Sequence, residues 1–128
     1  DVFQECRLGP HKLISAFVET QDGLRIGGYK LMYNPIIPDA NIDYKKSLFL
    51  GGNNYAGFKE MSFSSQKEYS SFQDFKYFKK VVLVDVEQNL DLYRVASIGT
   101  IISEKLYKSL MQINVTGVKF RELEVEIK

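Results

Sequence analysis

The stretch "TIISEKLYKSLMQINVTGVKFRELEVEIK", residues 100–128, contains the local signals that decide the fold. Ser103 stands just before a segment whose apolar residues recur at helical spacing, so it predicts the N-cap of a short helix. Asn114 and Gly117 tolerate the left-handed backbone that ends a helix and turns the chain. Residues 118–127 then alternate apolar and charged side chains, which predicts a closing strand.

Two segments upstream predict further strands. Residues 81–87, "VVLVDVE", form a β-branched run that is typical of a strand covered on both faces. The segment "LYRVAS", residues 92–97, follows a short turn, and its simplest partner is that run, in antiparallel orientation. Nearer the N-terminus, Asp22-Gly23 separates two apolar arms, residues 13–19 and 24–33, as in a hairpin. Gly27-Gly28 in the second arm predicts a bulge or a close approach of another backbone.

A second helix is predicted to open at Ser65, because Glu68 follows three residues later as in a capping box. We expect it to continue to Lys80, with an aromatic stripe that faces the core. The segment 34–46 contains two prolines and predicts a loop or an edge crossing. Residues 47–50 predict a short strand, and the glycine-rich residues 51–57 predict a second loop.

These elements predict an α+β protein. With 128 residues and 45% hydrophobic content, the chain is expected to form a single domain over residues 1–128. We expect a mainly antiparallel sheet with two short helices packed on it. Chains of this length bury enough surface to fold without a disulfide or a metal.

Charge and cysteine content narrow the functional classes. The net charge is +1, although residues 45–80 carry seven lysines against three acidic residues. A general nucleic-acid binder usually has a larger basic excess, so nucleic acid is not the expected partner. No apolar run is long enough for a membrane span, and no signal-peptide pattern is present. Cys6 is the only cysteine, which is typical of a reducing compartment, so we expect a cytoplasmic protein.

Residues able to perform chemistry are few. His11 is the only histidine, and a catalytic triad or a histidine metal site would depend on it. Asp39 and Asp43 lie four residues apart in the proline loop, where capping a turn is their commoner role. Asp85 and Glu87 would share one side of the predicted strand 81–87, with no third ligand evident. We therefore predict no catalytic, cofactor-binding or metal-binding residues, and no enzyme.

The C-terminal third resembles a known group of proteins. The pattern "ISEKLYKSL…TGVKFRELEV", preceded by "VVLVDVEQNLDLYRV", is similar to the C-terminal half of bacterial immunity proteins from contact-dependent and polymorphic toxin systems. The matching positions have the character of cap, core and turn residues, and they are Ser103, Glu104, Leu106, Leu110, Gly117, Val118, Phe120 and Val125.

The resemblance implies a non-catalytic protein that binds a cognate toxin domain and occludes it. Loop residues suited to such an interface are expected to bind the partner, and they are Asp39, Asp43, Tyr44, Asn53, Asn54 and Tyr55. Three other classes stay open: another protein-interaction module, a nucleic-acid-binding module and a small enzyme.

Overall fold

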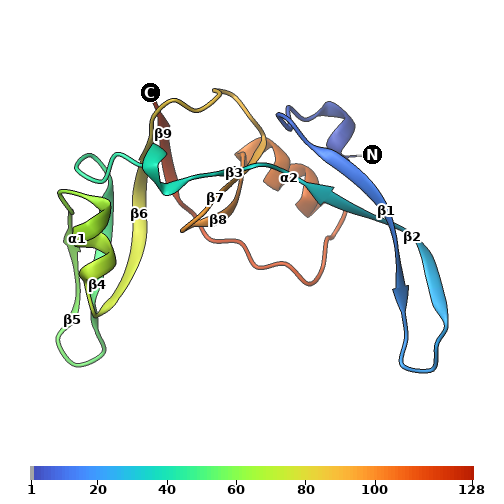
Figure 1. Ribbon diagram of the computed structural model, residues 1–128, viewed down its shortest axis with the longest axis horizontal. Helices are drawn as coiled ribbons and strands as arrows, with labels where there is room; N and C mark the ends of the chain where they lie inside the picture. The colour runs from blue at the N-terminus through green and yellow to red at the C-terminus, as the bar shows by residue number, and fades with distance from the viewer. Residues whose placement is uncertain (1) are drawn as a thin grey trace.

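The computed structural model describes residues 2–128, which form an arch built from three small sheets and two α-helices (Figure 1). The α+β class is therefore confirmed. A hairpin forms one end of the arch, a four-stranded sheet the other, and a three-stranded sheet lies between them. The elements are β1 Lys12–Glu19, β2 Arg25–Tyr33, β3 Ile36–Ile37, β4 Leu48–Asn53, β5 Gly57–Met61, α1 Gln66–Ser71, β6 Phe75–Leu83, β7 Leu92–Val95, β8 Gly99–Ile102, α2 Glu104–Gln112 and β9 Glu124–Ile127, with short 3₁₀ turns at Val2–Glu5 and Asp39–Asn41.

The N-terminal hairpin of β1 and β2 forms as predicted. Its turn is closed by Thr20 and Leu24, whose backbone groups hydrogen-bond at 2.9 Å, and Gly23 takes the left-handed conformation with φ 82°. A three-residue loop with glycine at that position is a common hairpin connection. The register shifts opposite Gly27-Gly28, which confirms the bulge.

The four-stranded sheet has the order β5-β4-β6-β9. The prediction of a loop over residues 51–57 was wrong in part, because Gly51–Asn53 continue β4 and the chain turns only at residues 54–56. The position of Gly52 shows why this strand contains glycine. A Cβ there would overlap the carbonyl oxygen of Gly57 across the hairpin, so the two backbones can approach only at glycine.

The first helix is much shorter than predicted. α1 ends at Ser71, and the residues expected to extend it to Lys80 form strand β6. Phe78 points into the core while its neighbours Tyr77 and Lys79 are exposed, which is the period of two of a strand. The aromatic spacing of three matched a helix by chance.

Strand β6 runs between β4 and β9 and has more buried residues than any other strand within residues 2–128. Val81, Val82 and Leu83 are fully covered, as the sequence predicted. The strand ends at Leu83, however, and Asp85 has a φ of 55°. The prediction that Asp85 and Glu87 share one side of a strand was therefore wrong.

The three-stranded sheet has the order β3-β7-β8. β7 pairs antiparallel with β8 and parallel with β3, so its predicted pairing with residues 81–87 was wrong. β3 comes from the proline loop, where Pro35 and Pro38 flank the two paired residues. Proline lacks a backbone donor, which keeps this strand short and at a sheet edge.

The C-terminal region follows its local signals. The hydroxyl of Ser103 accepts the N–H of Leu106 at 3.1 Å, so Ser103 is the N-cap of α2. Leu106 is fully buried. The spacing of Leu106, Leu110 and Ile113 predicts that they lie on one face of the helix, but Ile113 is exposed because the helix ends beside it. The closing strand begins only at Glu124, where β9 pairs parallel with β6.

The main core lies between α1, the inner face of the four-stranded sheet and the three-stranded sheet. Phe49 is its centre, with ring centroids 4.9 Å from Phe63 and 4.6 Å from Phe78. Tyr69 on α1 packs over β4 and β6, with its ring centroid 5.3 Å from that of Phe49 and 5.6 Å from that of Phe78. Burying aromatic rings in these tilted and edge-to-face contacts stabilises the fold beyond the area they remove from water.

Candidate functional site

The residues considered for chemistry are not brought together. His11 is exposed, and its Nδ1 lies 3.0 Å from the backbone oxygen of Gly9. The thiol of Cys6 donates to the backbone oxygen of Val2 at 3.3 Å, and burial raises its pKa, with the charge of Asp91 adding to the effect. Within residues 2–128, no group of three or more histidine, cysteine or acidic side chains is arranged to hold a metal ion.

The six residues predicted to bind a partner fall into two groups. Asp39, Asp43 and Tyr44 line one shallow hollow beside the start of α1. Asn53 is the last residue of β4, at the opposite end of that strand, and Asn54 and Tyr55 follow in the turn that joins β4 to β5 (Figure 1). The two groups thus do not form one continuous surface.

Two of the first group use their side chains within the fold. Asp39 accepts the N–H of Ser97 at 2.9 Å, and Asp43 accepts the N–H of Lys46 at 3.2 Å. Partial desolvation raises the pKa of Asp43, but the hydrogen bonds and the charge of Lys46 outweigh it and hold the pKa below its ordinary value. Both carboxylates therefore shape loops before they meet any partner.

Tyr44 is a core residue. It is only 5% exposed and stacks on Phe49, with 6.2 Å between ring centroids. Burial raises the pKa of its hydroxyl to about 12. The expectation that its side chain is exposed on the loop was wrong, because nothing in the sequence of the proline loop indicates that one aromatic side chain turns inward.

The second group presents a rigid, exposed aromatic residue. The side-chain oxygen of Asn53 accepts the N–H groups of Tyr55 and Ala56, at 3.0 and 2.8 Å. The amide nitrogen of Asn53 donates to Asp74 at 3.2 Å, which ties the turn to the start of β6. Tyr55 is fully exposed at the tip. The ring is thus held out on a turn whose backbone is fixed.

Three further aromatic residues continue from this tip over the outer face of the four-stranded sheet. Phe58 and Phe75 both lie opposite Gly52, and Tyr77 lies opposite Leu50, so the three side chains share the face turned away from α1. They are between 43% and 61% exposed. We call Tyr55, Phe58, Phe75 and Tyr77 the aromatic surface.

The aromatic surface has its own internal contacts. The rings of Phe58 and Tyr77 are 6.0 Å apart, and the guanidinium of Arg121 lies 5.7 Å from the centre of the Tyr77 ring. Lys79 and Glu60 form an ion pair on the same face. Gly52 leaves the row between Phe58 and Phe75 without a side chain. The result is a shallow apolar surface edged by charges.

This surface was missed by sequence reasoning, because Phe75 and Tyr77 were assigned to a helix. In the segment "FKYFKK", residues 75–80, only Phe75-Lys76-Tyr77 alternates apolar and charged residues, and Phe78 directly after Tyr77 breaks this period of two. The sequence therefore contained no sustained strand signal here.

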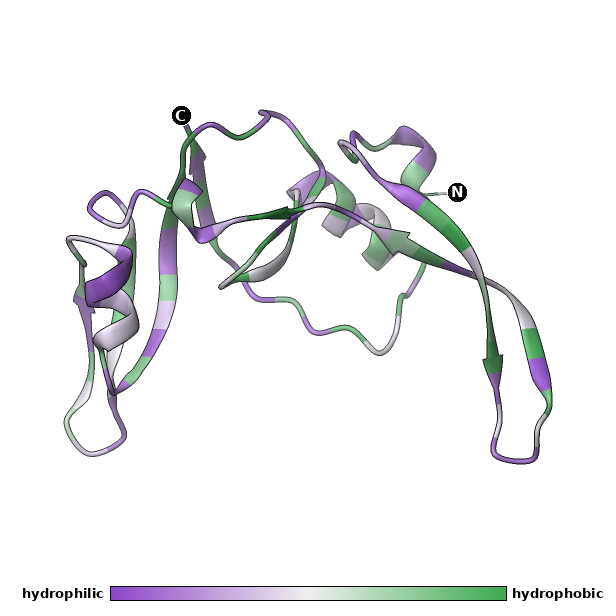
Figure 2. Ribbon diagram, viewed as in Figure 1, coloured by the Kyte–Doolittle hydropathy of each residue, from purple (hydrophilic) through white to green (hydrophobic). Residues whose placement is uncertain are grey.

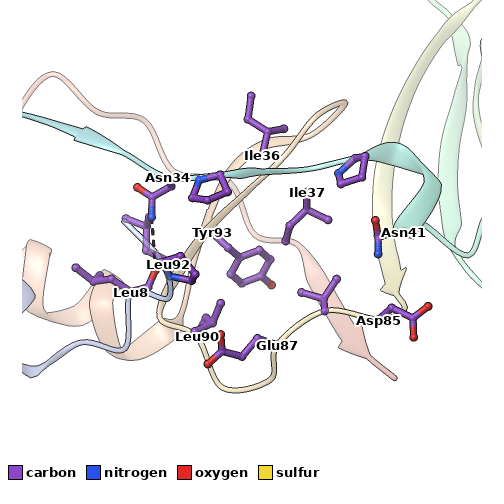
Figure 3. Close-up of a pocket in the computed structure, with 14 residues that line it drawn as sticks. Leu8, Asn34, Ile36, Ile37, Asn41, Asp85, Glu87, Leu90, Leu92 and Tyr93 are labelled. Atoms are coloured by element: carbon purple, nitrogen blue, oxygen red, sulfur yellow. Dashed lines mark hydrogen bonds between the residues drawn. The ribbon is translucent and has the colours of Figure 1, made fainter. Parts of the chain in front are cut away.

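A groove of about 340 Å³ lies between β3, β7 and the loop that follows β6 (Figure 3). Ile37, Leu90 and Tyr93 form apolar walls, and Asp85 and Glu87 add two carboxylates from the loop that follows β6. Glu87 pairs with Arg7 at 3.5 Å. The groove offers apolar contact rather than a set of groups aligned for a reaction.

Comparison of the chain with protein-family models, curated proteins and solved structures finds no significant match to any of them. Among the described residues, neither α-helix has the length or apolar character needed to cross a bilayer.

Proposed function

We propose that this protein binds a cognate bacterial toxin domain and neutralises it by covering the toxin's active site, as an immunity protein does. The observation that carries the proposal is the aromatic surface. Tyr55, Phe58, Phe75 and Tyr77 form an exposed aromatic group with Arg121 beside it. The resemblance of residues 81–127 to immunity proteins of polymorphic toxin systems supplies the class of partner.

The composition of the surface supports a protein partner. Tyrosine, phenylalanine and arginine are enriched at the centres of protein interfaces, and a few such residues supply most of the binding free energy. An aromatic side chain covers a large area while losing little rotational freedom on binding. Three of the four lie on paired strands, so their backbones need not be ordered when the partner arrives.

Inhibition by occlusion requires only a surface that fits the toxin in shape and binds it tightly. An interface of standard size, about 800 Å² on each partner, can reach nanomolar dissociation constants. Tyr55 at the tip of the β4–β5 turn would enter a concave active site, while the flat sheet face behind it would seal the rim. The complex would form in the cytoplasm of the producing cell, where the toxin would otherwise act.

A second candidate partner is single-stranded nucleic acid. Phe58, Phe75 and Tyr77 lie on a sheet face, where exposed rings can stack on bases, and residues 45–80 carry a local basic excess. Fluorescence anisotropy with labelled single-stranded RNA and DNA would identify it. Binding that weakens steeply from 50 to 200 mM salt and is lost in Tyr77→Ala would favour this function over toxin inhibition.

The proposed function is tested by co-expression with the toxin domain encoded beside this gene. We expect the pair to co-purify as a stable complex, and we expect cells that carry both proteins to grow. A matched set of variants consists of Tyr55→Ala, which removes a fully exposed ring, and Ile113→Ala, an exposed residue at the end of α2. Loss of co-purification only in the first supports the proposal. Absence of any complex with wild-type protein, with no rescue of growth, would contradict it.

A further inference from the structure

The hairpin of β1 and β2 stands apart from the rest of the molecule. Figure 1 shows it extending from the arch at the end opposite the four-stranded sheet. Apart from pairing with each other, its strands make few contacts with other elements. A two-stranded hairpin on its own is marginally stable in water, so a partner that covers it would stabilise its structure.

The strand register separates the hairpin into two unlike faces. Ile14 lies opposite Leu31, and Val18 lies opposite Ile26, so these four residues share one face. The pairing of Ala16 with Tyr29 and of Lys12 with Tyr33 places two tyrosines there as well. The large apolar side chains of this face, which we call the apolar hairpin face, are Ile14, Val18, Ile26, Tyr29, Leu31 and Tyr33.

The opposite face has satisfied polar groups. Lys30 donates to the Ser15 hydroxyl at 2.8 Å, and Arg25 pairs with Glu19 at 3.0 Å. The guanidinium of Arg25 also lies over the ring of Phe17, 4.6 Å from its centre. Leu13 and Phe17 are also exposed on this face, so it mixes polar and apolar groups where the apolar hairpin face is almost wholly apolar. Figure 2 shows the hydrophobic stretches along both strands of the hairpin.

The amount of exposed apolar surface matches an interface. The six side chains of the apolar hairpin face are between 43% and 62% exposed. Side chains of this size at about half exposure present on the order of 600 Å² together. Monomeric proteins seldom leave larger apolar patches uncovered, and a standard interface buries about 800 Å² on each partner once backbone and neighbouring atoms are counted.

We infer that the apolar hairpin face binds the same face of a second copy of this chain, so that two hairpins pack sheet against sheet about a two-fold axis. Interfaces between identical subunits are the more apolar class, and this face contains only one charged residue, Lys12 at its end. A two-fold arrangement buries the same patch on both copies, for a total on the order of 1,200–1,600 Å², the size of a stable dimer interface.

This dimer is independent of the toxin proposed above. The apolar hairpin face and the aromatic surface lie at opposite ends of the arch, so both can be occupied at once (Figure 1). Each dimer would then hold two aromatic surfaces. The oligomeric state can be measured with this chain alone, so its result does not depend on whether a toxin binds.

The test is sedimentation velocity of the 128-residue chain between about 5 and 200 μM. We expect a species of twice the 14.7 kDa chain mass. Two neighbouring residues give a matched pair of variants, because Ile14 and Leu13 are 54% and 55% exposed on opposite faces. We expect Ile14→Lys to weaken dimerisation at least tenfold, since it buries an unpaired charge, and Leu13→Lys to leave the dimer intact.

Three results would overturn the inference. The wild-type chain could sediment as a 14.7 kDa monomer throughout the concentration range. Both variants could remain dimeric, which would place the interface elsewhere, or both could dissociate, which would indicate pairing through strand edges. Loss of toxin binding in Ile14→Lys, with a monomeric wild type, would instead assign this face to the toxin.

A second measurement guards against a variant that fails to fold. In a Cys6→Ser background, Tyr29→Cys places a thiol on the apolar hairpin face, and Phe17→Cys places one on the opposite face. Under mild oxidation we expect a disulfide-linked dimer from the first and not from the second. Equal cross-linking of both would contradict the face assignment.

Discussion

Replacing Asp91 by alanine tests how the N-terminal segment is attached to the start of α2. Asp91 is 9% exposed, and its carboxylate accepts the N–H of Arg7 at 2.9 Å and the hydroxyl of Ser103 at 2.6 Å. Lys105 lies 3.9 Å away. Hydrogen bonds to a charged group contribute about 1.5–3 kcal/mol each, and water would recover part of that loss. We expect Asp91→Ala to lower the free energy of unfolding by about 2–4 kcal/mol.

Because of the same contacts, the contribution of Asp91 to the stability of the fold depends on pH. The hydrogen bond from Ser103, then that from Arg7, hold the pKa of Asp91 below its ordinary value, against the effect of desolvation. A depressed pKa in the folded state means that Asp91 stabilises the fold above the unfolded-state pKa of about 3.9. That stabilisation is lost as the pH falls through the folded-state pKa. In Asp91→Asn this part of the pH dependence should disappear.

Urea denaturation followed by far-UV circular dichroism measures both effects, since the chain has no tryptophan to report unfolding. Glu122→Ala is the control, because an exposed acidic residue outside the junction should change the free energy of unfolding by less than about 0.5 kcal/mol. If Asp91→Ala were no less stable than this control, or if the stability curves of Asp91→Asn and wild type ran parallel from pH 6 to 2, the reasoning about this junction would be refuted.

Three further predictions address the turns, the caps and the chemistry. Ser65→Ala should lower stability by roughly 0.5–2 kcal/mol through loss of the α1 N-cap, and an unchanged denaturation midpoint would show that the cap is not formed. Gly52→Ala should cost at least about 1–3 kcal/mol, because the φ of 154° at Gly52 favours glycine and a Cβ would also overlap the carbonyl oxygen of Gly57; a fully stable variant would contradict the described approach of β4 and β5. His11→Ala and Cys6→Ala should leave toxin binding within about twofold of wild type; a tenfold loss at preserved stability would reveal a role in function.

Local signals in the sequence predicted local structure well. Ser103 caps α2 because its hydroxyl reaches an N–H three residues away, a relation that the sequence contains entirely. The same holds for Ser65, although Glu68 accepts from the N–H of Ser64 rather than completing the expected box with Ser65. The Asp22-Gly23 hairpin is equally local.

Pairings between distant segments could not be predicted in this way. β3 lies parallel to β7 and β6 lies parallel to β9, and neither pair is joined by a turn. Parallel strands require long connections, so their register depends on the packing of the whole core. The inward orientation of Tyr44 could not be predicted for a related reason, since only its contacts with Phe49 and Tyr69 decide it.

The aromatic surface could not be predicted because the spacing of the aromatic residues in segment 75–80 was ambiguous between a helix and a strand. Phe75 and Phe78 are three residues apart in the sequence, which fits a helix, while in the structure Phe78 is buried between the exposed Tyr77 and Lys79, which fits a strand. Pairing with Leu48–Gly52 of β4 decides in favour of the strand and turns Phe75 and Tyr77 outward. Tyr55 was predicted from the sequence, but the surface that Phe58, Phe75 and Tyr77 form beside it became visible only with the sheet.

The central claim is most directly tested by calorimetric titration of the purified toxin domain with wild-type protein, with Tyr55→Ala and Tyr77→Ala, and with the control Ile113→Ala. We expect a nanomolar dissociation constant for the wild type and the control. Each aromatic replacement should weaken binding by about 2 kcal/mol, close to thirtyfold, as expected for residues at the centre of an interface. Equal affinity for all four proteins would place the interface elsewhere, and absence of binding by the wild type would contradict the proposed function itself.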